Sequence, residues 1–208
     1  LETFEMVGMT WSIGIIVSTI GINVAHELGH RVKKSEQLMS KSLLLSALYM
    51  HFLIEHNKGH HKNIATDEDP ASSRLNENLY AFWVRSTIGG YKSAWSLETA
   101  KLKKQGVSFF SFKNEMLVFQ LVQVTYLVFV GLYFGWFVVP FAIIIAITGF
   151  LLLETVNYIE HYGLRRKKLA SGRYENVTIQ HSWNSNHEMG RIFLYELTRH
   201  SDHHFKST

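Results

Sequence analysis

The sequence contains no cysteine and only two prolines. Without cysteine the chain has no disulfide, no thiolate metal site, no cysteine-ligated iron–sulfur cluster and no cysteine nucleophile. We expect no secretory signal peptide in these residues, because no basic region precedes the apolar beginning and no small-residue cleavage site follows it. The 208 residues are enough for one domain with its own core. We expect this domain, residues 1–208, to be a segment of a longer protein.

The basic residues are few and occur in short runs beside apolar segments. The net charge is +4, and the runs lie near residues 31–34, 101–104 and 165–168. No nucleic-acid recognition motif accompanies them, so we predict that the protein binds no nucleic acid. Basic runs that flank hydrophobic spans instead follow the positive-inside pattern. They predict a membrane protein whose basic segments face the cytoplasm.

Two long apolar stretches provide three segments that are each long enough to cross a bilayer. Residues 6–25 carry no charge, and residues 116–158 contain a single acid, Glu154. Gly135 and Pro140 interrupt the second stretch, so it predicts a hairpin of two spans at about 116–134 and 138–158. The apolar run 42–54 is too short to span and predicts a buried or re-entrant helix. We therefore expect an all-α, polytopic membrane helix bundle, with amphipathic helices at the membrane interface between residues 63 and 115.

Most of the twelve histidines are gathered in four clusters at the edges of these apolar segments. The stretch HELGH at residues 26–30 resembles the H-E-x-x-H motif of zinc peptidases, in which the glutamate acts as general base. The other clusters are EHNKGHH, NYIEHYG and RHSDHH. Together they contain nine histidines, listed by cluster as His26 and His30; His56, His60 and His61; His161; and His200, His203 and His204. The topology predicts that all four clusters meet on one side of the membrane.

Nine histidines at one polar face indicate a metal centre, because unpaired buried imidazoles carry large desolvation costs. One catalytic zinc takes about three protein ligands, so the set matches two metals with four or five nitrogens each. Imidazole binds iron, copper, nickel and zinc, and ligand type alone does not choose among them. A zinc peptidase with Glu27 as base and a non-enzymatic membrane metal-binding protein therefore stay open. Ligands at one membrane face, rather than along a pathway through it, count against a transporter.

The four clusters together closely resemble those of the integral-membrane alkane 1-monooxygenases, terminal alkane hydroxylases of the membrane fatty-acid desaturase and hydroxylase superfamily. The resemblance runs from about residue 10 to the end, and NYIEHYG separates these enzymes from ordinary desaturases. It implies a centre of two non-haem iron ions at the cytoplasmic face, held by the nine histidines listed above. It also implies an alkane and O₂ as substrates, rubredoxin with its reductase as electron donor, and a place in the bacterial inner membrane. Desaturation or hydroxylation of a fatty acyl chain, and xylene-type methyl oxidation, are the alternatives within the superfamily.

Ligating histidines normally pass their second N–H to an acceptor. Five acids adjacent to the clusters are candidates for this role: Glu27, Glu55, Asp69, Glu160 and Asp202. Helix capping or pairing with a nearby cation is the competing interpretation for each. His51, His181 and His187 fall outside the ligand pattern and are predicted to be structural.

Overall fold

The computed structural model describes residues 2–206, and within that range it is helical, without a β-strand. The predicted all-α architecture is confirmed. In chain order the helical elements are α1 (Thr3–Ile16), η1 (Val17–Ile22), α2 (Asn23–Gly29), α3 (Lys34–Ser46), α4 (Phe52–Glu55), η2 (His56–His60), α5 (His61–Asn63), α6 (Leu79–Lys104), α7 (Glu115–Phe134), η3 (Trp136–Val138), α8 (Val139–His161), η4 (Ile179–His181), α9 (Glu188–Phe193) and α10 (His200–Lys206). The segments η1 and η2 are π-helical, and η3 and η4 are 3₁₀ helices.

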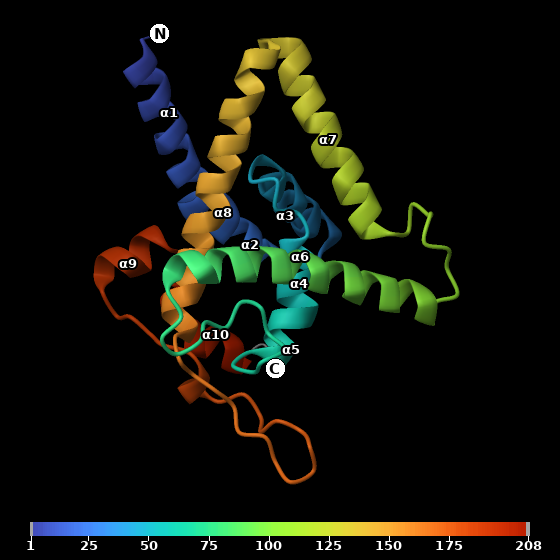
Figure 1. The fold of residues 1–208 in the computed structure, drawn as a ribbon, viewed down its shortest axis with the longest axis vertical. Helices are drawn as coiled ribbons and strands as arrows, with labels where there is room; N and C mark the ends of the chain where they lie inside the picture. The colour runs from blue at the N-terminus through green and yellow to red at the C-terminus, as the bar shows by residue number, and fades with distance from the viewer. Residues whose placement is uncertain (1, 207–208) are drawn as a thin grey trace.

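Three continuous helices are long and apolar enough to cross a membrane, and they support an integral membrane protein. The first, Thr3–Gly29, joins α1, η1 and α2; the others are Glu115–Phe134 and Trp136–His161. Gly135 makes the tight turn of the hairpin at a φ of 95°, a conformation that favours glycine. Figure 1 shows α7 rising to this turn and α8 descending beside α1. The first and third helices therefore end together, on the side where α7 begins.

Small residues allow α1 and α8 to approach closely. A Cβ atom on Gly14 would lie 2.7 Å from Thr148 Cβ, and one on Gly149 would lie 3.0 Å from Val17 Cγ1. Such close backbone approach is the usual packing mode of membrane helices, where no hydrophobic effect drives helices together. The contact fixes the lower end of α8 beside α2, where two histidine clusters lie.

The structure divides the predicted continuous helix 42–54 into the end of α3, a turn, and α4. Leu48 has a φ of 49°, which breaks the α-helical path. Two side chains from the membrane helices hold this turn: Glu154 Oε1 accepts from the Tyr49 hydroxyl at 3.0 Å, and Gln123 Oε1 accepts from Met50 N at 3.3 Å. Apolar periodicity could not reveal the break, because the polar groups that stabilise it lie more than 70 residues away in sequence.

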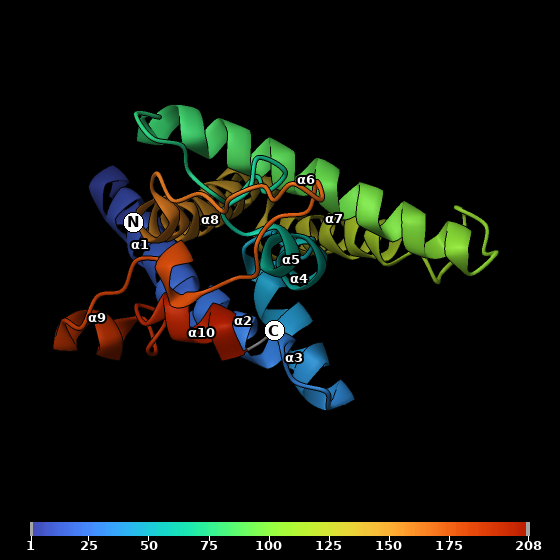
Figure 2. The same cartoon turned by 90° about the horizontal axis from the view of Figure 1, so that it is seen from below.

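The long helix α6 lies across the ends of the membrane helices, as the two views show (Figures 1 and 2). Asn78 caps its N-terminus by accepting from Ala81 N at 2.9 Å. At its other end, Lys101 contacts both Glu98 and Glu115 at 3.0 Å, which ties α6 to the start of α7. This crosswise helix backs the short segment α4–η2–α5 that carries three of the histidines.

Candidate metal centre

Four separate segments bring the nine predicted histidines to one end of the membrane helices. The side chains come from the end of the first long helix, from η2 and α5, from the last residue of α8, and from α10. Figure 2 shows α2, α5 and α10 gathered around one point when the molecule is seen from below. The nine histidines divide into two groups, within each of which the nearest ligand atoms lie within 4.8 Å of one another. The five-histidine group is His26, His30, His56, His61 and His203, and the four-histidine group is His60, His161, His200 and His204.

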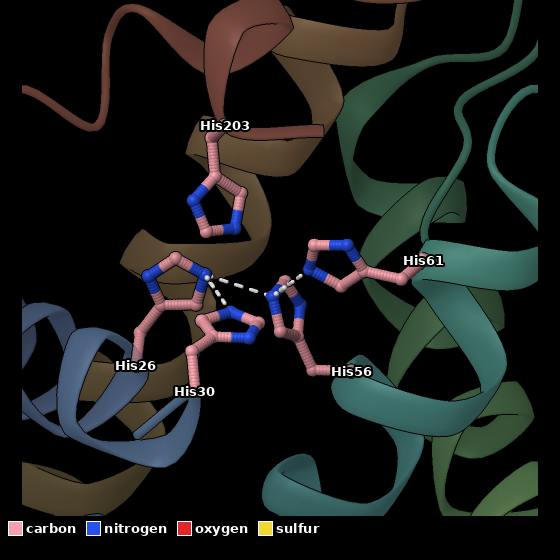
Figure 3. A group of neighbouring side chains, drawn as sticks. All are labelled: His26, His30, His56, His61 and His203. Carbon is pink, nitrogen blue, oxygen red and sulfur yellow. Dashed lines mark hydrogen bonds between the residues drawn. The ribbon is translucent and has the colours of Figure 1, made fainter. Parts of the chain in front are cut away.

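The five-histidine group is drawn in Figure 3, where the rings from the end of α2 and from η2, α5 and α10 face a common centre. Its close contacts are between Nε2 atoms. His26 lies 2.8 Å from His56 and 3.3 Å from His30, and His56 lies 2.9 Å from His61. In a neutral imidazole, Nε2 is either a donor with one hydrogen or an acceptor with one lone pair, so it makes one hydrogen bond. The Nε2 atoms of His26 and His56 each have two such neighbours. Hydrogen bonds alone therefore cannot account for both contacts.

The four-histidine group repeats this arrangement in a more buried place. Nε2 of His204 lies 2.8 Å from Nε2 of His200 and 3.2 Å from that of His60, while His200 and His161 are 3.0 Å apart. All four residues are at most 2% exposed, so bulk water cannot compensate their polar nitrogens. The group needs a buried partner that every Nε2 can share.

A metal ion fits both groups. At a metal–nitrogen distance of about 2.1 Å, neighbouring ligand nitrogens are about 3.0 Å apart at a right angle and about 3.4 Å apart at a tetrahedral angle. The observed Nε2–Nε2 contacts of 2.8 to 3.3 Å fall in or close to this range. The donor set also fits, because neutral imidazole is a common ligand of first-row transition metals. These residues can therefore hold metal, and their chemistry suggests iron among the candidates.

The π-helical winding of η2 explains how one short segment serves both groups. His56 and His61 are five residues apart and meet in the five-histidine group, whereas His60 points to the other group. In an α-helix, residues four apart share a face, and this spacing would have paired His56 with His60. A π-helix has a wider turn closed by i→i+5 hydrogen bonds, so residues five apart align instead. The i, i+4 rule still holds for His26 with His30 and for His200 with His204.

Burial keeps most of these imidazoles neutral, as metal ligands must be. Burial and then the neighbouring His60 lower the pKa of His61 to about 2. Burial followed by the charge of His26 lowers the pKa of His203 to about 3 and that of His30 to about 4. Neutral imidazoles present a lone pair on one ring nitrogen, so no proton has to leave before a metal binds.

His60 is the exception, because a buried carboxylate lies behind it. Its Nδ1 is 2.9 Å from Asp69 Oδ2, and Asp69 also accepts from Ser72 Oγ and Ala71 N. Burial, the largest single effect, lowers the pKa of His60, but the charge and hydrogen bond of Asp69 together with the charges of Glu55 and Glu154 raise the pKa above its ordinary value. A carboxylate only accepts, so His60 Nδ1 carries the hydrogen and Nε2 faces the other histidines. Asp69 thus stands where the sequence predicted an orienting acid.

Two further predicted acids also lie behind the rings, on the Nδ1 side. Glu27 Oε1 is 3.5 Å from His26 Nδ1 and 3.9 Å from His203 Nδ1, and Glu160 Oε2 is 3.3 Å from His200 Nδ1. In a zinc peptidase the motif glutamate must reach a water on the open side of the metal. Glu27 instead lies on the side of His26 opposite the converging Nε2 atoms. This position disfavours the peptidase interpretation of HELGH.

The remaining candidates lie elsewhere. Glu55 is buried beside Ser93, whose hydroxyl donates to it at 3.3 Å, and burial followed by the charge of Asp69 raises its pKa to about 8. The side chain of Asp202 lies outside the described residues. His51 packs against the Tyr49 ring at 4.5 Å and belongs to neither group. A small cavity beside Glu55 was not predicted; the one indication of it in the sequence is Glu154, a single acid in a long apolar run, which also lines it.

Comparison of the sequence with known protein families identifies the family of the chain. The model of the fatty acid desaturase family matches residues 4–208, nearly the whole chain. The chain belongs to the fatty acid desaturase family. This membership agrees with its helical membrane architecture and its histidine groups.

Individual members of the family give a narrower likeness. The chain is 44% identical over its full length to an alkane 1-monooxygenase of Pseudomonas putida and 43% identical to alkane 1-monooxygenase 1 of Alcanivorax borkumensis. It is 27% identical, over 98% of its length, to the hydroxylase component of a xylene/toluene monooxygenase of Pseudomonas putida. The chain covers 52%, 51% and 54% of these relatives, about half the length of each.

Proposed function

We propose that this chain carries the metal-binding core of a membrane alkane 1-monooxygenase. The observation that carries the proposal is the convergence of nine histidines into groups of five and four, in a chain 44% identical to a curated alkane 1-monooxygenase. Each group would hold one non-haem iron, giving two per chain. The groups lie at the end of the spans beside the basic runs, which favours the cytoplasmic face of a bacterial inner membrane.

The reaction proposed is R–CH₃ + O₂ + 2e⁻ + 2H⁺ → R–CH₂OH + H₂O, with a medium- or long-chain alkane as R–CH₃. Rubredoxin, reduced by its reductase, would supply the electrons. When bound, the irons supply the activation of O₂, which no side chain of this protein can provide. The protein's own task is to hold the ligands, to place the terminal methyl group near them and to exclude water.

Named residues support these tasks. Asp69 accepts a hydrogen bond from His60 Nδ1, so that His60 Nε2 is directed into its group, and Glu160 lies 3.3 Å from His200 Nδ1 on the corresponding side of that ring. On the membrane side, the Phe52 ring packs on His56 at 4.8 Å and on His26 at 6.2 Å. This ring gives the five-histidine group an apolar wall where an alkane methyl group would have to approach. It also keeps water from the same side.

The test is product analysis of cells that make the full-length protein together with a rubredoxin and its reductase and are fed n-octane. We expect 1-octanol and two irons per purified chain. His161→Ala should abolish the product while the protein stays in the membrane. His187→Ala is the matched control, because this exposed histidine lies outside both groups. A chain with one zinc and no iron, or full activity of the His161→Ala protein, would overturn the proposal.

A second candidate reaction is oxidation of the methyl group of an alkylbenzene, favoured by the likeness to the xylene/toluene hydroxylase component. The lower identity of 27% makes it the weaker candidate. Feeding p-xylene and n-octane to the same cells separates the two, since each gives a different primary alcohol.

A further inference from the structure

The single acid of the long apolar hairpin, Glu154, is paired with a tyrosine rather than with a cation. Its Oε1 accepts from the Tyr49 hydroxyl at 3.0 Å, and both residues are at most 4% exposed. Ser86 and Asn157 are further hydrogen-bonding side chains beside this buried carboxyl group. An ionisable residue inside a membrane span is costly and is usually retained for function. The proposed hydroxylation assigns Glu154 no part.

Tyr49 also stands in a column of stacked rings that leads to the metal centre. Its ring stacks on Phe150 of α8 at 4.9 Å with an interplanar angle of 12°, and on Phe52 at 6.0 Å and 23°. Phe52 in turn stacks on His56 at 4.8 Å and 26°. The Phe52 ring thus lies between Tyr49 and His56 in the stack. Electron transfer falls steeply with distance and with gaps, so this is a favourable short route.

We propose that Tyr49 is a redox-active tyrosine that reduces the oxidised metal centre when no substrate is present. This inference rests on the proposed function, which supplies the oxidant. In the step, the Tyr49 O–H bond breaks, its electron passes by way of Phe52 and His56 to the oxidised centre, and its proton passes to the Glu154 carboxylate. The products are a neutral tyrosyl radical, a protonated Glu154 and a centre reduced by one electron. The oxidising equivalent is thereby moved away from the ligands.

The surroundings of Tyr49 favour this coupled step. Burial, followed by the charge of Glu154, raises the pKa of the Tyr49 phenol well above its ordinary value, so the O–H bond is intact at neutral pH. Loss of an electron alone would leave a cation in an apolar interior, which is expensive unless the proton leaves as well. The hydrogen-bonded carboxylate is an acceptor already in place. A small cavity of about 10 Å³, lined by polar side chains such as Glu55 and Glu154 and by apolar ones such as Phe52, has room for about one water molecule beside the pair.

Tyr158 provides a matched control within the same fold. Tyr158 is a half-buried tyrosine on α8, and its hydroxyl donates to a backbone carbonyl, Glu77 O, at 2.6 Å. A carbonyl oxygen accepts a hydrogen bond but cannot take up a proton at neutral pH. The inference therefore predicts radical formation at Tyr49 and none at Tyr158.

The experiment uses the full-length, iron-loaded enzyme, mixed with reductant and O₂ without alkane and frozen at successive times for electron paramagnetic resonance. We expect a tyrosyl radical signal near g = 2 whose hyperfine pattern changes when the protein contains ring-deuterated tyrosine. Tyr49→Phe and Glu154→Gln should lose the signal, since one lacks the O–H group and the other lacks the proton acceptor. Tyr158→Phe should keep it, and added n-octane should suppress it in the wild-type protein.

Two further measurements separate the possible failures. Iron content and 1-octanol yield are measured on the same preparations, and we expect both to survive Tyr49→Phe, which leaves the ring stack in place. An enzyme that makes 1-octanol but gives no radical, or keeps its radical in the Tyr49→Phe protein, overturns the inference and leaves the proposed function standing. An enzyme that makes no alcohol overturns the proposed function and removes the oxidant on which Tyr49 would act.

Discussion

Asp69 offers the sharpest test of how the protein prepares its metal ligands. It is fully buried, and its carboxylate accepts from His60 Nδ1 at 2.9 Å, from Ser72 Oγ at 2.5 Å and from Ala71 N at 3.0 Å. In Asp69→Asn, the backbone contact can be kept by the amide oxygen, which leaves the NH₂ group facing His60. That group donates, so His60 Nδ1 must accept and the ring hydrogen moves to Nε2. The nitrogen intended for the metal is then blocked.

The expected loss can be estimated from the behaviour of such supporting residues. Their mutation typically lowers metal affinity 10–100-fold, which corresponds to about 1.4–2.7 kcal/mol. We expect the upper end, because neither side chain has access to water that could relieve the mismatch. The affinity is measured by competition with a chromophoric chelator for Fe²⁺ or Co²⁺ on the solubilised full-length protein.

Asp67→Asn is the control for this experiment. It makes the same chemical change two residues earlier, on an exposed side chain that lies 3.7 Å from Arg165. We expect its affinity to equal that of the wild-type protein. If Asp69→Asn bound metal as tightly as Asp67→Asn, the argument that the carboxylate sets the tautomer of His60 would be refuted.

Two further predictions concern Gly59 in the π-helical segment η2 and the ion pair between Glu77 and Arg85. In Gly59→Ala, a Cβ would lie 2.5 Å from Glu55 Oε1 inside the π-helical segment, so we expect metal content to fall, whereas Gly8→Ala meets nothing within 4 Å and should bind normally. The Arg85 hydrogen bonds lower the pKa of Glu77, so its ion pair stabilises the fold above the ordinary glutamate range and is lost as the pH falls through the lowered pKa. Thermal melts from pH 6 to pH 3 should show this loss in the wild-type protein and a flatter profile in Glu77→Gln; parallel profiles would contradict it.

Much of this architecture could be predicted from local sequence. The three predicted spans each lie within one long apolar helix of the structure, because span length and apolar composition are properties of a continuous stretch. The nine histidines could be chosen because clusters at the ends of apolar segments are brought to the same membrane face. Asp69 could be proposed because it follows the second cluster closely in sequence.

The division of the histidines between two groups could not be predicted in this way. It depends on the π-helical turn that pairs His56 with His61, and no residue pattern here separates that turn from an α-helical one. The helix break near Leu48 could not be predicted for a related reason. The side chains that stabilise it, Glu154 and Gln123, belong to other helices. In both places, contacts with residues distant in sequence determine the backbone conformation and override the local helical periodicity.

The two groups differ in what surrounds them, and the difference follows from the order of the helices. The four-histidine group is held by α8, α10 and η2, and the acids behind it, Asp69 and Glu160, are both buried. The five-histidine group has Phe52 on its membrane side and the half-exposed Glu27 on its aqueous side. Phe52 therefore contacts both the five-histidine group and Tyr49. In the function proposed above, the ring that would face the alkane is also the ring through which the proposed electron transfer from Tyr49 would pass.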